Sequence, residues 1–125
     1  MVEIINPSHT LYSIHLHISD EIKVEVGKLG SILFKKGEYI YVGSAKRNII
    51  ARINRHIKEE KVQKWHFDYL RPHGIITKII TYETSIGECQ LSEKLRKESG
   101  GCWPVKKFGS TDCKCPSHLI FVASS

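Results

Sequence analysis

One feature constrains the fold of this chain most. It is a short apolar strand that is followed by small residues and then directly by a basic helix. Residues 39–42 (Tyr-Ile-Tyr-Val) have the composition of a strand, and Gly43, Ser44 and Ala45 follow them. Isoleucines then recur at helical spacing, which predicts a helix of about three turns over Arg47–Glu59. A strand that enters a helix through so short a turn predicts a domain of mixed α and β structure.

The remaining elements follow from the same periodicities. Strands are predicted at Leu11–Ile18, Ile22–Val26, Ser31–Phe34, Tyr39–Val42, Ile75–Tyr82 and His118–Ala123, and a second helix at Ile86–Lys97. The second and third of these strands flank a glycine-bearing turn and are expected to form a hairpin. Strands interleaved with helices indicate an α/β or α+β fold with a small mixed sheet flanked by helices. The 125 residues suit one domain that spans 1–125.

The charge of the chain favours a polyanionic partner. Lysine and arginine (19 residues) outnumber aspartate and glutamate (13 residues), which gives a formal net charge of +6 with the histidines neutral. Neutralising phosphates with such charges releases counterions and supplies affinity for nucleic acid without regard to sequence. A nucleic-acid partner is therefore expected.

The apolar and cysteine content indicates the compartment. No apolar run reaches the length that spans a membrane, and the first seven residues lack the basic-then-apolar pattern of a secretory signal. We therefore expect a cytoplasmic protein with no membrane partner. The four cysteines, Cys89, Cys102, Cys113 and Cys115, are then expected to be reduced thiols or metal ligands rather than a disulfide framework.

Two polar side chains on the first helix are candidates for chemistry on a phosphate. Arg52 and His56 are one turn apart and fall on the same flank of the isoleucine stripe, beside the turn after Tyr41. The loop 43–45 could also present backbone N–H groups to an anion. Both residues also have a structural interpretation. Arg52 can be a surface arginine whose aliphatic stem packs on the core, and His56 can be a histidine that the helix dipole favours at the end of the helix.

The same residues resemble a known nuclease signature. Tyr41-Val42-Gly43 resembles the second half of the GIY-YIG signature, and Thr10-Leu11-Tyr12 stands in the place of the first half. Arg52, eleven residues after Tyr41, resembles the catalytic arginine of that superfamily, and His56 stands where an aromatic residue or a histidine follows it.

Most of the chain is similar to one little-characterised branch of this superfamily, whose members are short stand-alone proteins or are fused to endonuclease III-like repair enzymes. The matching segments are 39–45, Arg52-x-x-Arg55-His56, 65–70, Glu88-Cys89, 108–115 and His118-Leu119. The chain departs from the superfamily where Thr10 replaces a glycine, and where the hairpin 22–34 separates the two motif strands. The resemblance implies a GIY-YIG-like fold with that hairpin inserted.

The resemblance implies hydrolysis of phosphodiester bonds with one divalent cation, Mg²⁺ or Mn²⁺, held by a glutamate on a helix. Tyr12 or Tyr41 would help to deprotonate the attacking water, aided by His56, and Arg52 would neutralise charge on the scissile phosphate. DNA, as a repair or recombination structure, is favoured over RNA. The residues expected to contact nucleic acid are Gly43, Ser44, Lys46, Arg47, Arg55 and His66.

Two glutamates of the second predicted helix compete for the metal. The general spacing of the superfamily, with a small residue four positions earlier, selects Glu93 after Cys89. On a helical wheel, however, Glu88 shares a face with apolar residues, while Glu93 points to solvent. We choose Glu88, although Ser85-x-x-Glu88 also has the pattern of a capping box.

Two further clusters are open to two interpretations each. If residues 65–68 are extended, His66 and Asp68 share a face and either line the cleft or form a local hydrogen-bonded pair, with Trp65 and Phe67 packed into the core. Cys113, Cys115 and His118 offer zinc ligands, with Cys89 or Cys102 as the fourth, but their spacing matches no common zinc motif. We favour buried thiols in a structural turn over zinc.

The leading hypothesis is a metal-dependent nuclease, with a monomer assumed. The alternatives are a nucleic-acid-binding module that has lost cleavage and a zinc-stabilised interaction domain. The nuclease hypothesis requires that Tyr12, Tyr41, Arg52, His56 and Glu88 meet at one concave patch.

Overall fold

The computed structural model describes residues 1–59, 62–83, 86–111 and 115–123. A five-stranded sheet of order β1-β6-β2-β5-β7 forms its centre, and β3 and β4 pair as a separate hairpin. The strands are β1 (Val2–Ile4), β2 (Leu11–Ile18), β3 (Ile22–Glu25), β4 (Ser31–Phe34), β5 (Gly37–Ser44), β6 (Ile75–Tyr82) and β7 (Leu119–Ala123). The α-helices are α1 (Ile49–Ile57), α2 (His66–Leu70) and α3 (Glu88–Ser99), with 3-10 turns η1 (Gly27–Leu29) and η2 (Arg71–His73). The predicted mixed α+β fold, including the hairpin between β2 and β5, is confirmed.

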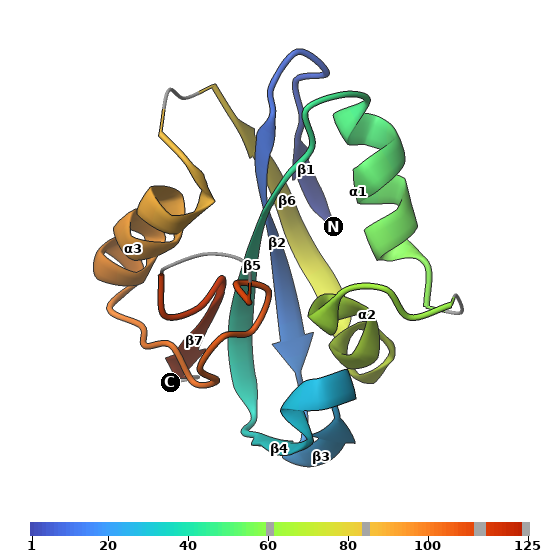
Figure 1. Cartoon of the computed structure of the whole chain (residues 1–125), viewed down its shortest axis with the longest axis vertical. Coiled ribbons are helices and arrows are strands. Elements are labelled where there is room, and N and C mark those ends of the chain that lie inside the picture. Colours follow the sequence, from blue (N-terminus) through green and yellow to red (C-terminus); the bar gives the residue numbers. More distant parts are fainter. Residues whose placement is uncertain (60–61, 84–85, 112–114, 124–125) are drawn as a thin grey trace.

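The helices cover both faces of the sheet (Figure 1), with α1 and α2 on one side and α3 on the other. Tyr12, Ile14 and Leu16 of β2 point into the larger core on the side of α1 and α2. Leu11 of the same strand belongs to a second core with Leu91 of α3. The strand predicted over Leu11–Ile18 is therefore confirmed, and its two faces pack into different cores.

Helix α1 forms because its isoleucines provide one apolar stripe. Ile49 and Ile53 are buried against the sheet. The helix begins after Asn48, which adopts the left-handed conformation (φ 49°) and accepts a hydrogen bond from the N–H of Ala51 through its side chain. The helix is thus shorter than predicted by two residues at each end.

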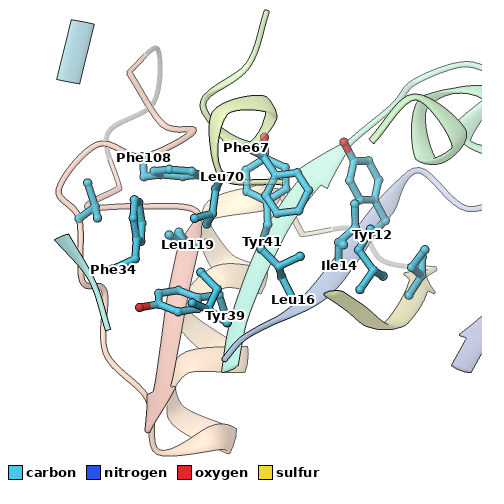
Figure 2. Packing of buried hydrophobic residues seen from close by; sticks show 14 of the residues in the cluster. Tyr12, Ile14, Leu16, Phe34, Tyr39, Tyr41, Phe67, Leu70, Phe108 and Leu119 are labelled. Carbon is cyan, nitrogen blue, oxygen red and sulfur yellow. The ribbon is translucent and has the colours of Figure 1, made fainter. Parts of the chain in front are cut away.

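Residues 66–70 form a helix where an extended segment was considered. Asp68 accepts hydrogen bonds from the backbone N–H groups of Lys64 (2.7 Å) and Trp65 (2.9 Å), which caps the start of α2. Phe67 stacks on Tyr41 at 4.8 Å between ring centroids (Figure 2), so packing fixes this short helix against β5. Local capping and this aromatic contact determine the conformation of the segment, which is too short to show a helical period in its sequence.

The expectation of reduced thiols is wrong for two cysteines. Cys89 and Cys115 form a disulfide, with their Cα atoms 5.5 Å apart, whereas Cys102 is free and exposed. The pairing arises because the start of α3 packs against the chain just before β7, which the sequence spacing could not show. Cys113 and Ser85, and with Ser85 the predicted capping box, lie outside the described residues.

Among the described helices, none has both the length and the apolar character that a membrane crossing requires.

Candidate active site

Four of the five side chains required by the nuclease hypothesis meet at one cavity of about 210 Å³. Its lining consists of Tyr12, Tyr41, Gly43, Ser44, Arg52, Trp65, Glu88 and Gly109. The fifth, His56, lies beneath the cavity in contact with Tyr12. A larger hollow of about 440 Å³ at the other end of β2 includes Asp20, Glu21 and Glu59 in its lining, which would repel a phosphate. We therefore take the smaller cavity as the candidate site.

The pairing of β2 with β5 sets the position of the first tyrosine. Tyr12 lies directly opposite Gly43 in this antiparallel pair, and the Tyr12 ring covers the glycine. A Cβ added at Gly43 would lie 2.5 Å from Cζ of Tyr12, closer than real side chains approach one another. Glycine is needed here to make room for the phenol, a role different from the predicted contact with nucleic acid.

A chain of polar groups leads inward from the Tyr12 hydroxyl. The hydroxyl is 2.7 Å from Nε2 of His56, and Nδ1 of His56 is 4.0 Å from Oδ1 of Asp68. Both His56 and Asp68 are buried. The carboxylate also accepts a hydrogen bond from Nη1 of Arg55 at 3.0 Å. The phenol, the imidazole and the carboxylate are thus arranged in a row.

Protonation states follow from this burial. Desolvation raises the pKa of Tyr12 well above its ordinary value; the charge of Arg52 opposes this shift, and that of Glu88 adds to it. Burial likewise raises the pKa of Tyr41, so both phenols are neutral near pH 7. Burial also acts to raise the pKa of Asp68, but the two backbone N–H groups and Arg55 outweigh it and hold that pKa below its usual range. Asp68 is therefore an anion beneath the imidazole.

The guanidinium of Arg52 is fixed at the wall of the cavity. Its Nη1 donates to the Ser44 carbonyl at 3.0 Å, and the group lies over the Trp65 ring, 4.5 Å from the centroid. Arg55 lies 4.3 Å from the same centroid. Trp65, which one of the two interpretations above placed in the core, is half-buried and lies against the two arginines. The position of Trp65 depends on how α2 packs, and no local sequence pattern indicates it.

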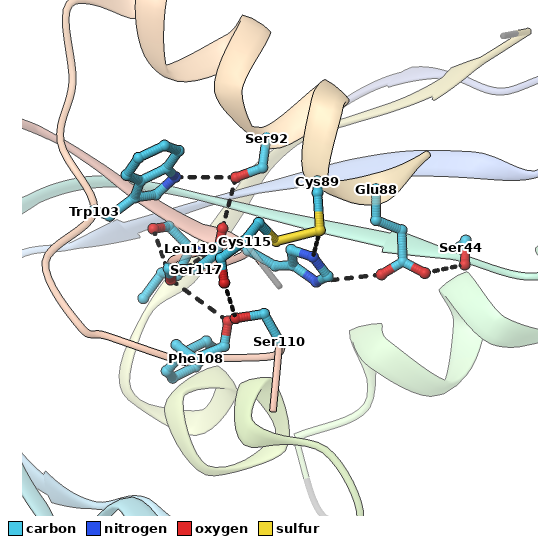
Figure 3. Close-up of a disulfide and its surroundings, with 11 residues drawn as sticks. Ser44, Glu88, Cys89, Ser92, Trp103, Phe108, Ser110, Cys115, Ser117 and Leu119 are labelled. Atoms are coloured by element: carbon cyan, nitrogen blue, oxygen red, sulfur yellow. Dashed lines mark hydrogen bonds and ion pairs between the residues drawn. A yellow bond between two sulfur atoms is a disulfide. The ribbon is translucent and has the colours of Figure 1, made fainter. Parts of the chain in front are cut away.

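Glu88 reaches the cavity from the first residue of α3. One carboxylate oxygen accepts a hydrogen bond from the Ser44 hydroxyl, and the other lies 3.2 Å from Nδ1 of His118 (Figure 3). The Glu88 side chain is 31% exposed. Glu93 instead is 52% exposed and pairs with Lys97 at 3.4 Å on the outside of the helix. Only Glu88 of the two glutamates lines the cavity.

The donor set at the cavity fits a hard divalent cation. Mg²⁺ retains several waters and commonly binds proteins through one or two carboxylates together with phosphate oxygens. One half-exposed carboxylate in a polar cavity matches that requirement. Glu88 is thus the residue that would hold such an ion.

The other residues predicted to contact nucleic acid fall into different environments. Lys46 and Arg47 are exposed in the loop between β5 and α1. Arg55 pairs with Asp68 and also donates to the Val62 carbonyl at 2.9 Å, so it has a structural role. His66 accepts a hydrogen bond from the N–H of Gly109 at 2.8 Å, and burial lowers its pKa. The exposed pair is therefore better placed than these two to meet a long polyanion.

The backbone of residues 43–45, which was expected to bind an anion, is partly engaged in the sheet. Gly43 and Ser44 belong to β5 itself, and the N–H of Ala45 donates to the Thr10 carbonyl at 2.8 Å. Asn48 caps the start of α1. The Ala45 N–H is therefore already used within the protein.

A comparison with known protein families identifies the family of this chain. The family described as domain of unknown function DUF123 matches residues 11–125. The chain belongs to this family. The matched region of this DUF123 protein contains every residue of the cavity and the disulfide. Comparison with curated proteins and with solved structures gave no significant match.

Proposed function

We propose that this DUF123 protein is a metal-dependent nuclease of the GIY-YIG type that hydrolyses phosphodiester bonds of DNA. One observation carries the proposal: two phenols, a guanidinium and a carboxylate from four separate elements line the same small cavity. A volume of about 210 Å³ has room for a phosphate group and a few waters, since a water occupies about 30 Å³ in the liquid.

Arg52 is the group that receives the phosphate. Its guanidinium is held by the Ser44 carbonyl and the Trp65 ring, which leaves little conformational freedom to lose on binding. An arginine presents several N–H donors in one plane and so matches two phosphate oxygens at once. This preorganised charge stabilises the additional negative charge of the transition state.

The Tyr12–His56 pair supplies the route for the proton of the attacking water. A neutral phenol with a raised pKa is a poor base, so it accepts a proton only as it passes its own to Nε2 of His56. The imidazolium formed in this way is stabilised by the anion of Asp68. The water proton moves to the Tyr12 oxygen and the phenolic proton moves to His56, which leaves hydroxide to attack phosphorus.

Glu88 holds the divalent cation, Mg²⁺ or Mn²⁺, which when bound supplies positive charge to the leaving oxygen. Ser44 and His118 orient the two oxygens of Glu88, so the carboxylate has a fixed direction.

The test is cleavage of branched, nicked and single-stranded DNA, and of RNA, with Mg²⁺ or Mn²⁺. We expect Arg52→Ala and Glu88→Gln each to lower the rate by at least about 100-fold, because each removes charge stabilisation made in the transition state. Glu93→Gln is the matched control and should keep wild-type activity, since Glu93 is paired on the outside of the same helix. Circular dichroism verifies that every variant is folded. Wild-type cleavage that survives both substitutions would refute the assignment.

A nucleic-acid-binding module without cleavage is the alternative. It is favoured by the fact that both oxygens of Glu88 already have protein partners. In that case the wild-type protein binds DNA with salt-dependent affinity through Arg52, Lys46 and Arg47 but cleaves no substrate with either cation.

A further inference from the structure

A second group of ligand-type side chains lies on the opposite side of Glu88 from the cavity. The Sγ atoms of Cys89 and Cys115 and the imidazole of His118 lie within 4.8 Å of one another. Figure 3 shows Cys89 on α3 joined to Cys115, with Glu88 beside them. Nε2 of His118 is 3.5 Å from Sγ of Cys89, so this ring nitrogen faces the sulfurs.

We propose that Cys89, Cys115 and His118 bind one zinc ion when the disulfide is reduced. Two thiolates and an imidazole form the donor set that zinc prefers, and this set is too soft for Mg²⁺. Water or one further side chain completes the tetrahedron. This proposal does not depend on the nuclease assignment, because its ligands and its metal are different, although Glu88 contacts both sites.

The far side of the imidazole supports the assignment. Histidines that ligate zinc usually donate their other ring N–H to a carboxylate, which fixes the ring and increases its basicity. Nδ1 of His118 lies 3.2 Å from Oε2 of Glu88, while Nε2 faces the sulfurs. The carboxylate, the imidazole and the sulfur pair thus have the order of a carboxylate–histidine–zinc site.

Hydrogen bonds, in addition to the disulfide, hold the segment 115–118 in place. The N–H of His118 donates to the Phe108 carbonyl at 2.8 Å, and the Ser92 hydroxyl donates to the Ser117 carbonyl at 2.8 Å. Trp103 in turn donates to the Ser92 hydroxyl at 3.0 Å. Reduction therefore frees one sulfur on α3 and one on a segment that remains hydrogen-bonded to Ser92 of α3 and to Phe108.

The chemistry balances with a dithiol as the reductant. The dithiol becomes a disulfide, and its two electrons and two protons pass to the sulfurs of Cys89 and Cys115. Zinc binding then releases both thiol protons, because thiolates are the ligands. Oxidation by a disulfide reverses the first step and expels the ion.

The test uses the full chain, reduced with a trialkylphosphine, which becomes the phosphine oxide with oxygen from water. After removal of metal by a chelator, the protein is titrated with Zn²⁺, or with Co²⁺ as a coloured probe. We expect one ion per chain with the spectrum of tetrahedral cobalt–thiolate, and no binding by the oxidised protein. Zinc should protect Cys89 and Cys115, but not the exposed Cys102, from alkylation.

Variants assign the ligands. Cys89→Ser, Cys115→Ser and His118→Ala should each weaken zinc binding by at least about 100-fold. Cys102→Ser, the matched control, should leave the affinity unchanged. Glu88→Gln should weaken it by about 10- to 100-fold as an outer partner of the histidine.

Equal alkylation of Cys89, Cys102 and Cys115 in the presence of zinc, or equal affinity in Cys89→Ser and Cys102→Ser, would overturn the proposal. The protection experiment needs no variant, so it decides even where a substitution prevents folding. Because no nucleic acid is present, failure here is distinct from failure of the nuclease assignment.

Discussion

The absence of a side chain at Gly43 determines the position of Tyr12, the candidate base. Tyr12 can cross β5 because Gly43 has no Cβ, and this places the hydroxyl on Nε2 of His56. Burial keeps the phenol neutral, so its chemistry depends on the imidazole behind it. In the proposed mechanism the phenol and the histidine therefore act as one unit, because the neutral tyrosine alone is a poor base.

Tyr12→Phe tests this unit because it removes one oxygen and keeps the ring. We expect the cleavage rate to fall by about 10²- to 10⁴-fold, the range that a positioned acid–base group contributes. The free energy of unfolding should fall by about 1 kcal/mol, because a buried hydrogen bond to His56 is lost. Single-turnover kinetics and urea denaturation measure the two effects.

Tyr39→Phe is the matched control for Tyr12→Phe. The Tyr39 hydroxyl donates to the Lys35 carbonyl at 2.7 Å and is absent from the lining of the cavity. This variant should lose similar stability and keep full activity. Equal loss of activity in both variants would show that the effect is one of stability and not of proton transfer.

Helix α2 connects the candidate site to the core although it has only five residues. Asp68 caps the start of α2, pairs with Arg55 of α1 and lies beneath His56. Trp65, which precedes the helix, supports the guanidinium of Arg52. The segment therefore positions three side chains of α1 at once.

Asp68→Asn should destabilise the protein by about 1–3 kcal/mol near neutral pH, because the charged hydrogen bonds of a buried carboxylate are lost. The folded pKa of Asp68 lies below its ordinary value of 3.8. Its contribution is thus complete above about that pH and is lost as pH falls through the folded pKa. The difference between variant and wild type should shrink correspondingly in acid, as measured by urea denaturation from pH 7 down to pH 2. A difference that stays constant over this range would contradict the role of the ionised carboxylate.

Elements with a clear period could be predicted, whereas those fixed by contacts could not. The alternation in 11–18 predicted β2, and the isoleucine spacing predicted α1. A strand was also predicted over 75–82, where β6 forms. In contrast, β1 has three exposed residues that are ordered by parallel pairing with β6, which leaves no local pattern. The short α2 likewise depends on one cap and one aromatic stack.

The candidate site divides in the same way. Tyr12, Tyr41 and Arg52 follow from a motif, and a helical wheel separates Glu88 from Glu93. The contacts of Trp65 with Arg52 and of Asp68 with His56 depend on how α2 packs, so these contacts are evident only from the fold. The Cys89–Cys115 pair joins residues 26 apart in sequence, and no spacing rule indicates it.

Both layers of helices contribute to the cavity, which lies where β5 ends at Ser44. Arg52 comes from α1 on one face of the sheet, and Glu88 comes from α3 on the other. The two layers are linked here by the contacts of Ser44 with both side chains. Whatever holds the start of α3 in place therefore also holds the carboxylate in the site.

The disulfide is the covalent part of that support, so its reduction tests how far the stability of the domain depends on it. Cross-linking residues 26 apart lowers the entropy of the unfolded chain, which is worth about 3 kcal/mol. Reduction in the presence of a chelator should thus lower the melting temperature of the wild type. The melting temperature of Cys102→Ser should fall equally, since Cys102 is not in the bond. In Cys89→Ser it should be low already and insensitive to the reductant; a further large decrease would show that the reductant acts elsewhere.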